Sequence, residues 1–460
     1  MATTPAPQAN ALPSRAATFY ASGSFTGNLI SRVAAVWIFY FYAHSADGGP
    51  RVPLWLLGGI ITATGLISAF DDMLVGYWSD RTRSRWGRRV PYIVLATPVW
   101  ALLIFLLWAP PVPGESLVNA VYLYVVLQSF EFFRTLSGGP FEALLPEIAP
   151  QNEDRVRIVV RQVFFGTLGA AVALVAAGPV IDHFGYRWMA AGAALLALGS
   201  RYLALAGVWR HIRRDIPPAA TPLLSAYRAC FRNDQFRAFL PTFVLFNLGT
   251  TLMTVALPFY VRQIFQTEES RVGTITAIMS AVPIAAVLLS LPLVQRLALR
   301  RGKAYVYALC MLAGALYFPV LFFMGFVPQV PSLVQGLLFM PPVGLAMVGV
   351  YVFPNALMAD IIDYDALRTG ERREGIYYAA QDFIENLVLA LHGSILAGLL
   401  AFGSTPENPL GIRLVGPFAG VGIFIAWWIF RRYTLPDTVT AEALAAAPAD
   451  AALLPAREVA

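Results

Sequence analysis

The chain is a succession of long apolar runs separated by short polar segments. Twelve runs have about 20 residues, the length that an α-helix needs to cross the hydrocarbon core of a bilayer. They cover residues 18–43, 54–78, 90–109, 117–139, 158–181, 187–209, 238–262, 272–295, 304–327, 332–358, 375–402 and 411–430. The runs are continuously apolar and do not alternate with a period of two, which favours helices over a membrane barrel. We therefore predict an all-α membrane protein with twelve transmembrane helices.

The polar segments between the runs predict the topology. Lys and Arg gather after the even-numbered runs, as in Arg210, Arg213 and Arg214, whereas the opposite segments hold few. Positive segments stay on the cytoplasmic side, so we expect both termini there. Composition agrees, because 58% of the residues are hydrophobic and 13% are charged, against about 25% charged in soluble domains. The net charge of +6 then reflects membrane orientation, and we expect no nucleic-acid partner.

The longest predicted cytoplasmic connection divides the chain into two parts. It covers residues 210–237, contains the helix-breaking pair that begins at Pro217, and leaves six runs on each side. We predict an N-terminal six-helix half over 1–209, a C-terminal six-helix half over 238–431 and a disordered cytoplasmic tail over 432–460. Two six-helix halves joined by a long central loop are typical of the major facilitator fold, in which the solute binds between the halves at mid-depth.

Three polar motifs make the pattern more specific. Residues 76–91 read Gly-x-x-x-Asp-Arg-Thr-x-x-x-x-Gly-Arg-x-x-Pro, with five arginines between positions 81 and 89. Residues 359–375 contain Ala-Asp-x-x-Asp-Tyr followed by Thr-Gly-x-Arg-x-Glu-Gly, and residues 140–147 read Pro-Phe-Glu-Ala-Leu-Leu-Pro-Glu. Taken in this order, the motifs resemble those of the glycoside–pentoside–hexuronide:cation symporters, the family of the melibiose permease.

This resemblance implies a function. A member of the family is a secondary active transporter that moves a sugar, glycoside or uronide with H⁺ or Na⁺ by alternating access, in a plasma (inner) membrane. The expected partners are the solute, the cation and the bilayer, with the protein as a monomer. We expect no enzyme activity and no cofactor, because the sequence has neither a phosphate-binding Gly-x-x-x-x-Gly-Lys-Ser/Thr motif nor metal-ligand spacing. Two alternatives stay open: transport of a lysolipid or other amphiphilic organic anion, and a non-transporting membrane sensor.

Charged residues from the three motifs, together with Arg155 after the motif at 140–147, form a candidate cytoplasmic gate. Its members are Asp80, Arg81, Arg88, Glu147, Arg155, Asp360, Asp363, Arg372, Arg373 and Glu374. We expect them to pair across the two halves and to close the cytoplasmic side. Exposed ion pairs contribute only about 0–1 kcal/mol each, which suits contacts that must also break. The alternative is that these charges only fix the topology.

Ionisable residues inside the predicted spans are the next candidates, because a charge at mid-membrane is costly and functional by default. They are Arg32, Asp71, Asp72, Glu131, Arg134, Glu142, Arg161, Arg201, Asp382 and Glu385. The resemblance places the coupling-cation site at Asn28, Ser68 and Asp72. Asn28 and Ser68 stand where the family has carboxylates, so the site keeps its oxygens but only one charge. This favours proton coupling, altered Na⁺ affinity or uncoupled transport. The alternative for Asp72 is a structural ion pair, a role that Asp71 can also fill because it points about 100° away on the helix.

The solute site is predicted partly from helical spacing and partly from the resemblance. Arg134, Gly138 and Glu142 are spaced at i, i+4 and i+8, so they share one helix face. The family's sugar-binding carboxylate aligns near Gly138, while its arginine and lysine align with Arg161 and Asn386. The candidate solute-binding residues are Arg134, Gly138, Glu142, Arg161, Arg32, Asp382 and Asn386. Arginine binds carboxylates through two parallel hydrogen bonds, which favours an anionic solute such as a uronide. Alternatively, Glu131 neutralises Arg134 from three residues away.

Overall fold

The computed structural model describes residues 12–44, 49–149, 152–212, 230–327, 329–370 and 373–436. Within these ranges every regular element is a helix, which confirms the predicted all-α fold. Most of the predicted central loop and of the predicted tail lies outside the described ranges. The chain divides into two compact units, the first made of residues 1–41 and 67–220 and the second of 42–66 and 221–460.

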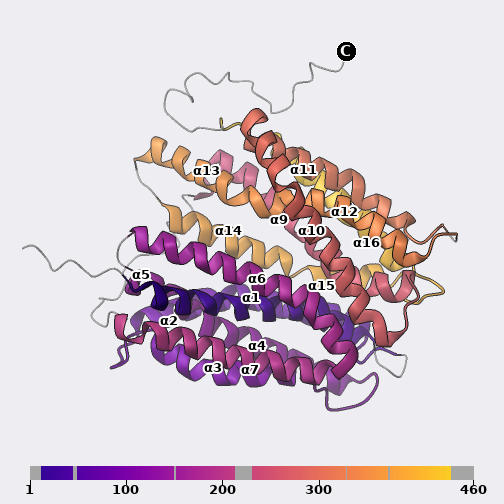
Figure 1. The fold of residues 1–460 in the computed structure, drawn as a ribbon, viewed down its shortest axis with the longest axis horizontal. Helices are drawn as coiled ribbons and strands as arrows, with labels where there is room; N and C mark the ends of the chain where they lie inside the picture. The colour runs from indigo at the N-terminus through magenta and orange to yellow at the C-terminus, as the bar shows by residue number, and fades with distance from the viewer. Residues whose placement is uncertain are drawn as a thin grey trace, which may run out of the picture. The chain divides into compact units, whose positions relative to one another are not determined.

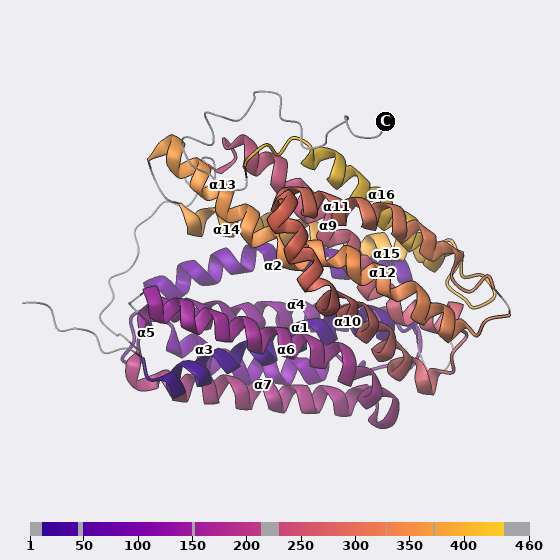
Figure 2. The ribbon, with the colours of Figure 1, turned by 45° about the horizontal axis from the view of Figure 1, so that its top comes forward.

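The first unit is a bundle of membrane-length helices joined by short connections. Helix α3 packs on both α4 and α7, and α6 also packs on α7 (Figures 1 and 2). The unit contains α1 (Ser14–Ala43), the second half of α2 (Leu54–Arg81), α3 (Val90–Leu106), α4 (Leu117–Ala143), α5 (Leu145–Ile148), α6 (Asn152–Phe184), α7 (Tyr186–Val208) and the 3₁₀ turn η1 (Trp209–His211).

The second unit has its core around α9, which packs closely on α16, while α10 packs on α12. It contains α9 (Asp234–Phe259), the π-helical turn η2 (Tyr260–Ile264), α10 (Glu269–Arg301), α11 (Lys303–Tyr317), the 3₁₀ turn η3 (Phe318–Phe323), α12 (Ser332–Val352), α13 (Pro354–Thr369), α14 (Glu374–Leu389), α15 (His392–Leu400) and α16 (Leu410–Phe430).

The first half of α2 belongs to the second unit because small residues bring it against α15. A Cβ atom built on Gly58 would lie 2.7 Å from the carbonyl oxygen of Gly393, so only glycine fits there. One turn further along α2, the hydroxyls of Thr62 and Ser394 lie 2.7 Å apart. The two helices can therefore approach closely enough to share a hydrogen bond within an apolar contact.

Nine helices in the described ranges are long and apolar enough to cross a membrane, and α3 is a shorter apolar helix. Helices α1 and α4 have 30 and 27 residues. Each carries charged residues along its length, which lowers its apolar character. The count of twelve spans therefore remains a prediction.

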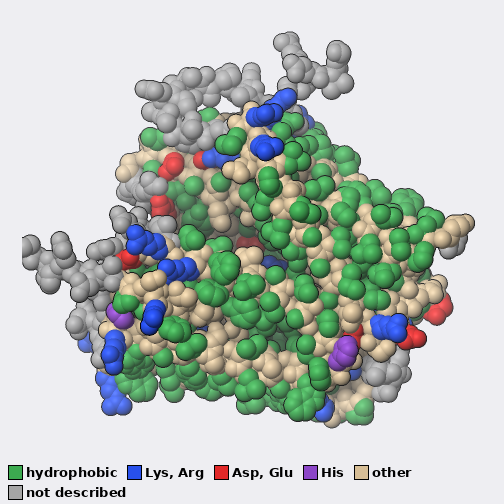
Figure 3. Space-filling model, in the orientation of Figure 1, with side chains coloured by type: hydrophobic (Ala, Val, Ile, Leu, Met, Phe, Trp, Pro, Cys, Tyr) green, Lys and Arg blue, Asp and Glu red, His purple; other side chains and the backbone are tan. Residues whose placement is uncertain are grey.

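The surface of the helices is apolar, as a lipid-facing surface requires. Large hydrophobic side chains such as Leu289, 82% exposed, and Trp55, 74% exposed, stand on it. Figure 3 shows hydrophobic side chains spread widely over the visible face. A soluble protein rarely exposes apolar surface on this scale, so the multi-pass membrane assignment follows from the structure as well as from the sequence.

The polar segment between the tenth and eleventh predicted runs is mostly helical. Residues 359–374 lie between these runs, where we predict a connecting loop, but α13 continues into the segment as far as Thr369. The helix stops at Gly370, which adopts a left-handed conformation with φ of 74° that glycine alone tolerates without strain. The motif 76–91 also begins as helix, because α2 runs to Arg81. The polar motifs therefore lie largely on helix ends that extend the apolar spans.

Helices α1 and α6 approach each other at a glycine. A Cβ atom on Gly169 would lie 2.0 Å from the carbonyl oxygen of Phe25, so the backbones must separate if any side chain is added. We expect Gly169→Ala to lower the free energy of unfolding by about 1–3 kcal/mol, the usual cost of overpacking. The matched control is Gly192→Ala on α7, where a Cβ meets no atom within 4 Å. Thermal unfolding in detergent measures both variants, and equal melting temperatures would contradict the close contact.

Candidate functional site

A cavity of about 230 Å³ lies inside the first unit, lined by residues of α1, α3, α4 and α7. Helix α1 contributes small and polar residues on one face: Gly23, Ser24, Gly27, Asn28 and Ser31. A Cβ atom on Gly27 would meet no atom within 4 Å, so α1 leaves open space there while offering hydroxyl and amide groups. A polar cavity in the middle of apolar helices is the arrangement expected of a solute site.

Helix α4 contributes the charged wall of the cavity. Arg134, Gly138 and Glu142 all line it, so the predicted shared face is present. The Nε atom of Arg134 donates to Oε2 of Glu131 at 2.7 Å, an ion pair three residues apart. The ion pair that the alternative expects between Glu131 and Arg134 is therefore present. Glu142 is exposed to the cavity, and a Cβ atom on Gly138 would meet no atom within 4 Å.

Helices α3 and α7 add two lining residues that our solute-site prediction omits, Trp100 and Arg201. The Arg201 guanidinium carbon lies 4.2 Å from the centre of the Phe141 ring and 5.9 Å from that of Trp100. The sequence signal for Arg201 is its charge inside a predicted span, although no motif marks it as part of the solute site. In the structure it falls in the buried stripe of α7 with Ala197 and Ala204.

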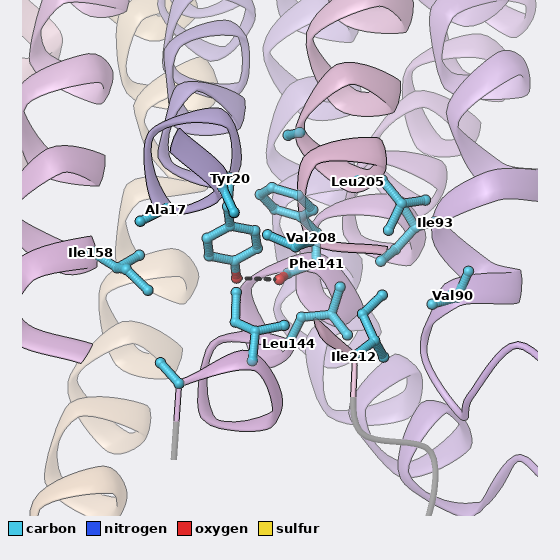
Figure 4. Close-up of a cluster of buried hydrophobic side chains, with 14 residues drawn as sticks. Ala17, Tyr20, Val90, Ile93, Phe141, Leu144, Ile158, Leu205, Val208 and Ile212 are labelled. Atoms are coloured by element: carbon cyan, nitrogen blue, oxygen red, sulfur yellow. Dashed lines mark hydrogen bonds between the residues drawn. The ribbon is translucent and has the colours of Figure 1, made fainter. Parts of the chain in front are cut away.

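Phe141 is held in place by α1. The Tyr20 hydroxyl donates to the carbonyl oxygen of Phe141 at 2.6 Å, and the two rings lie 4.7 Å apart (Figure 4). A Cβ atom on Gly23 would lie 2.6 Å from Cζ of Phe141, so glycine is required there for the ring to fit. The aromatic surface under Arg201 is therefore fixed by the buried cluster that includes Leu144, drawn in the same figure.

The predicted coupling-cation residues are only partly brought together. Asn28 lines the cavity and donates from its side chain to the Ser24 carbonyl oxygen at 3.0 Å. Asp72 accepts a hydrogen bond from the Thr135 hydroxyl at 3.0 Å and interacts electrostatically with Arg134. Ser68 is half-buried one turn earlier on α2. The structure describes no cluster of three or more His, Cys, Asp or Glu side chains able to hold a metal ion.

Asp71 occupies a different environment from Asp72. It is 8% exposed and accepts a hydrogen bond from the Gln128 amide at 3.4 Å. Asp72, the next residue, is exposed. The two carboxylates thus face different neighbours on α4, as their angular separation on the helix predicts.

Four predicted solute-binding residues do not line this cavity. Arg161 donates to the carbonyl and hydroxyl oxygens of Ser14 at 2.9 and 3.0 Å, in a separate depression near the start of α1. Arg32 is half-buried on α1 outside the cavity lining. Asp382 and Asn386 are exposed on α14, in the second unit.

The gate residues of the first unit form a buried ion-pair cluster. Glu147, 2% exposed, accepts from Nε of Arg88 at 2.8 Å and lies 3.1 Å from an Arg89 nitrogen. Arg155 donates to the Ala149 carbonyl oxygen at 2.7 Å. We expected Glu147 to pair with the other half, but in the structure it pairs inside its own unit, through the turn that carries Arg88 and Arg89.

The gate residues of the second unit also find partners within that unit. The Lys303 ammonium lies 2.6 Å from Oδ1 of Asp360, and an Arg373 nitrogen lies 4.0 Å from Asp365. Neither Lys303 nor Asp365 is in our predicted gate. Of the other members, Arg81 stacks on the Tyr77 ring, with its guanidinium carbon 3.6 Å from the ring centre. Asp363 and Glu374 each have an interaction partner. The Asp80 side chain and Arg372 lie outside the described part of the chain.

Apolar, membrane-length helices and the family match together define the class of the protein as a multi-pass membrane transporter and not an enzyme. The solved structure of the nucleoside transporter NupG has the same fold, with a TM-score of 0.62 at 15% identity over 91% of this chain and all of that one. The chain belongs to the family described as MFS/sugar transport protein, whose model matches residues 19–409, and within it to the glycoside–pentoside–hexuronide symporters.

Two bacterial relatives span most of the chain. The inner membrane symporter YicJ of Escherichia coli is 24% identical over 84% of this chain and 82% of its own length. A glucuronide carrier protein homolog of the same organism is 23% identical over 91% of this chain and 92% of its own. The family predicted from the three polar motifs is thus confirmed by similarity along nearly the whole sequence.

Proposed function

We propose that the protein is a cation-coupled symporter of a sugar, glycoside or uronide that works by alternating access. The observation that carries this proposal is the polar cavity between α1, α3, α4 and α7, in which hydroxyl, amide, carboxylate and guanidinium groups surround a space inside an apolar bundle. Sugars are bound by such mixtures of hydrogen-bonding groups and aromatic faces. The relative named as a glucuronide carrier supports a solute of this class.

The proposal includes twelve transmembrane spans in two halves. Nine helices of the described ranges meet the length and hydropathy of a span, and we propose α1, α3 and α4 as the other three. The charges on α1 and α4 lower the apolar character of two of the four helices that line the cavity. With an even number of spans and basic cytoplasmic segments, both termini lie in the cytoplasm. The relative named as an inner membrane symporter supports placement in that membrane, and we propose a monomer there.

Coupling is assigned to Asn28, Ser68 and Asp72, which offer amide, hydroxyl and carboxylate oxygens. Asp72 is the charged member and is exposed on α2, so its carboxylate is available to a proton or a cation. It lies beside Thr135, the residue that follows Arg134 on the cavity wall. Binding of a cation at Asp72 therefore changes the charge next to the solute site. Coupling requires that cation binding changes the affinity for the solute in this way.

Solute binding is assigned first to the cavity residues on α4. The remaining candidates Arg32, Arg161, Asp382 and Asn386 stay in the proposal as residues that contact the solute in another conformation of the transport cycle. The buried charge clusters at Glu147 and Asp360 are proposed to fix the cytoplasmic helix ends that move as the gate closes and opens.

Gly138 provides a test of the solute site, since the family carboxylate aligns there. A Cβ meets no atom within 4 Å, so Gly138→Asp should fold. We expect the added carboxylate to weaken binding of an anionic glycoside by roughly tenfold, equivalent to about 1.4 kcal/mol of repulsion. Gly138→Asn is the matched control, with the same shape and no charge. If the two substitutions weaken the binding of the anionic glycoside equally, the cause is steric blockage. In that case the charge at position 138 does not affect solute binding.

Solute counterflow in proteoliposomes tests the proposed function directly. The panel contains neutral glycosides, uronides and lysolipids, each loaded inside and traced from outside without an ion gradient. The proposal predicts counterflow of at least one glycoside or uronide and none of a lysolipid. Exchange of lysolipid alone would favour the amphiphile transporter, and no exchange of any solute would favour a sensor.

A further inference from the structure

Arg201 is a buried guanidinium whose hydrogen-bonding groups are unused. It is 7% exposed and lines the cavity from α7. The described part of the chain offers it no hydrogen bond and no carboxylate within 4 Å; its contacts are the faces of Phe141 and Trp100. An arginine carries five N–H donors in one plane. A charge taken this far from water with its donors unpaired is costly unless something binds it.

The aromatic contacts of Arg201 are cation–π contacts and leave its N–H donors without a hydrogen-bond acceptor in the described part of the chain. The guanidinium carbon stands over the Phe141 ring, 4.2 Å from its centre. The N–H groups point outward in the guanidinium plane, where an oxyanion with two oxygens accepts two parallel hydrogen bonds. The Tyr20 hydrogen bond and the Gly23 contact fix Phe141, so this orientation is preorganised.

The other charges around the cavity show why Arg201 differs from Arg134. Arg134 donates to Glu131 at 2.7 Å and is already neutralised. Glu142 interacts electrostatically with both arginines and with Asp72, but no side chain in the described ranges hydrogen-bonds its carboxylate. Tyr20 on α1, Asp72 on α2, Arg134 and Glu142 on α4, and Arg201 on α7 are the titratable and charged groups that face this region.

We propose that Arg201 is the anion-binding residue of the solute site, and that it holds the carboxylate or sulfonate group of an anionic glycoside while Glu142 serves as its counter-charge in the empty cavity. This inference rests on the proposed function and names the substrate class of the same site. An arriving oxyanion takes the place of Glu142 as the partner of Arg201. Uptake of a proton by Glu142 relieves the repulsion between the two anionic groups, so anion binding strengthens as the pH falls.

The test is competition binding to the purified full-length protein with three methyl glycosides that differ at one position: methyl glucoside, methyl glucuronide and the corresponding 6-sulfonate. The wild type should bind the two anions more tightly than the glucoside. Arg201→Gln should weaken binding of the anions by about 10-fold to 100-fold, the effect of losing hydrogen bonds between charged groups, with glucoside binding little changed. The affinity of Arg201→Lys for the two anions should lie between those of the wild type and of Arg201→Gln, because an ammonium group cannot bind an oxyanion bidentately. The matched control is Arg187→Gln, an exposed arginine on the same helix.

Glu142→Gln makes the inference testable even where Arg201 variants fold poorly. Removal of the counter-charge should strengthen glucuronide binding and flatten its pH dependence, the opposite sign to Arg201→Gln. Weaker glucuronide binding in Glu142→Gln, or equal losses for glucoside and glucuronide in Arg201→Gln, would overturn the inference.

The three glycosides separate the possible results. Preference for only one of the two anions in the wild type would identify the oxyanion as carboxylate or sulfonate and support the inference. Equal binding of glucoside and both anions would overturn this inference and leave the proposed transport function standing. No binding or exchange of any glycoside would contradict the proposed function, and this inference with it.

Discussion

Asp72→Asn is expected to abolish cation-driven accumulation of solute while solute exchange across the membrane continues. The substitution removes the charge but keeps an oxygen that can accept the Thr135 hydrogen bond, now 3.0 Å long. A neutral amide neither takes up a proton nor balances a cation, so a gradient of H⁺ or Na⁺ no longer does work on the solute. Uptake should then stop when the solute concentrations inside and outside are equal. The measurement is solute accumulation in proteoliposomes with an imposed ion gradient.

Asp71→Asn is the matched control for this prediction. Asp71 is the neighbouring carboxylate, is buried and accepts from Gln128, so its loss should leave the ion dependence of uptake intact. Unchanged dependence on pH and Na⁺ in Asp72→Asn would remove Asp72 from the coupling site. Loss of coupling in Asp71→Asn alone would move the site to the other face of α2.

Glu147→Gln is expected to lower the free energy of unfolding by about 3–5 kcal/mol. The Glu147 carboxylate is 2% exposed and joins the Arg88 and Arg89 side chains at 2.8 and 3.1 Å. Removing one partner from a buried ion pair leaves the other charges uncompensated, and this accounts for the large cost. Thermal and denaturant unfolding of the purified protein in detergent measures the loss.

The control for Glu147 is an ion pair on the surface. An Arg368 nitrogen lies 3.2 Å from Oδ1 of Asp234, and the two side chains are 57% and 47% exposed. Arg368→Gln should therefore change stability by no more than about 1 kcal/mol. If Glu147→Gln costs no more than Arg368→Gln, the buried ion pairs of Glu147 do not stabilise the fold as described.

The helices of this protein could be predicted from sequence because their lengths are set by the membrane. Their polar ends were harder to predict. Residues 359–369 are polar and follow a predicted span, which predicts a loop, yet α13 continues through them and ends at Thr369. The hydropathy of the sequence indicates which residues contact lipid, but it does not indicate where the hydrogen-bonded helix ends. Helix termini outside the membrane depend instead on glycine caps and on contacts such as that of Lys303 with Asp360.

The candidate site shows the same division between local and tertiary information. The cavity-facing positions Arg134, Gly138 and Glu142 follow from the period of one helix. The placement of Arg201 over Phe141 depends on how α1, α4 and α7 pack, which no single helix encodes. The partners of Glu147 were predicted across the halves because charge alone does not say which oppositely charged residue is nearer. Local geometry brings Arg88 and Arg89 to it first.

The most direct test of the account is gradient-driven accumulation of one anionic glycoside. Purified protein in proteoliposomes takes up labelled methyl glucuronide under an inward H⁺ gradient, an inward Na⁺ gradient or neither. The account predicts accumulation above equilibration with at least one gradient, and its loss when an ionophore dissipates that gradient. Uptake that reaches the same level with both gradients, with neither and with the ionophore would contradict cation-coupled symport.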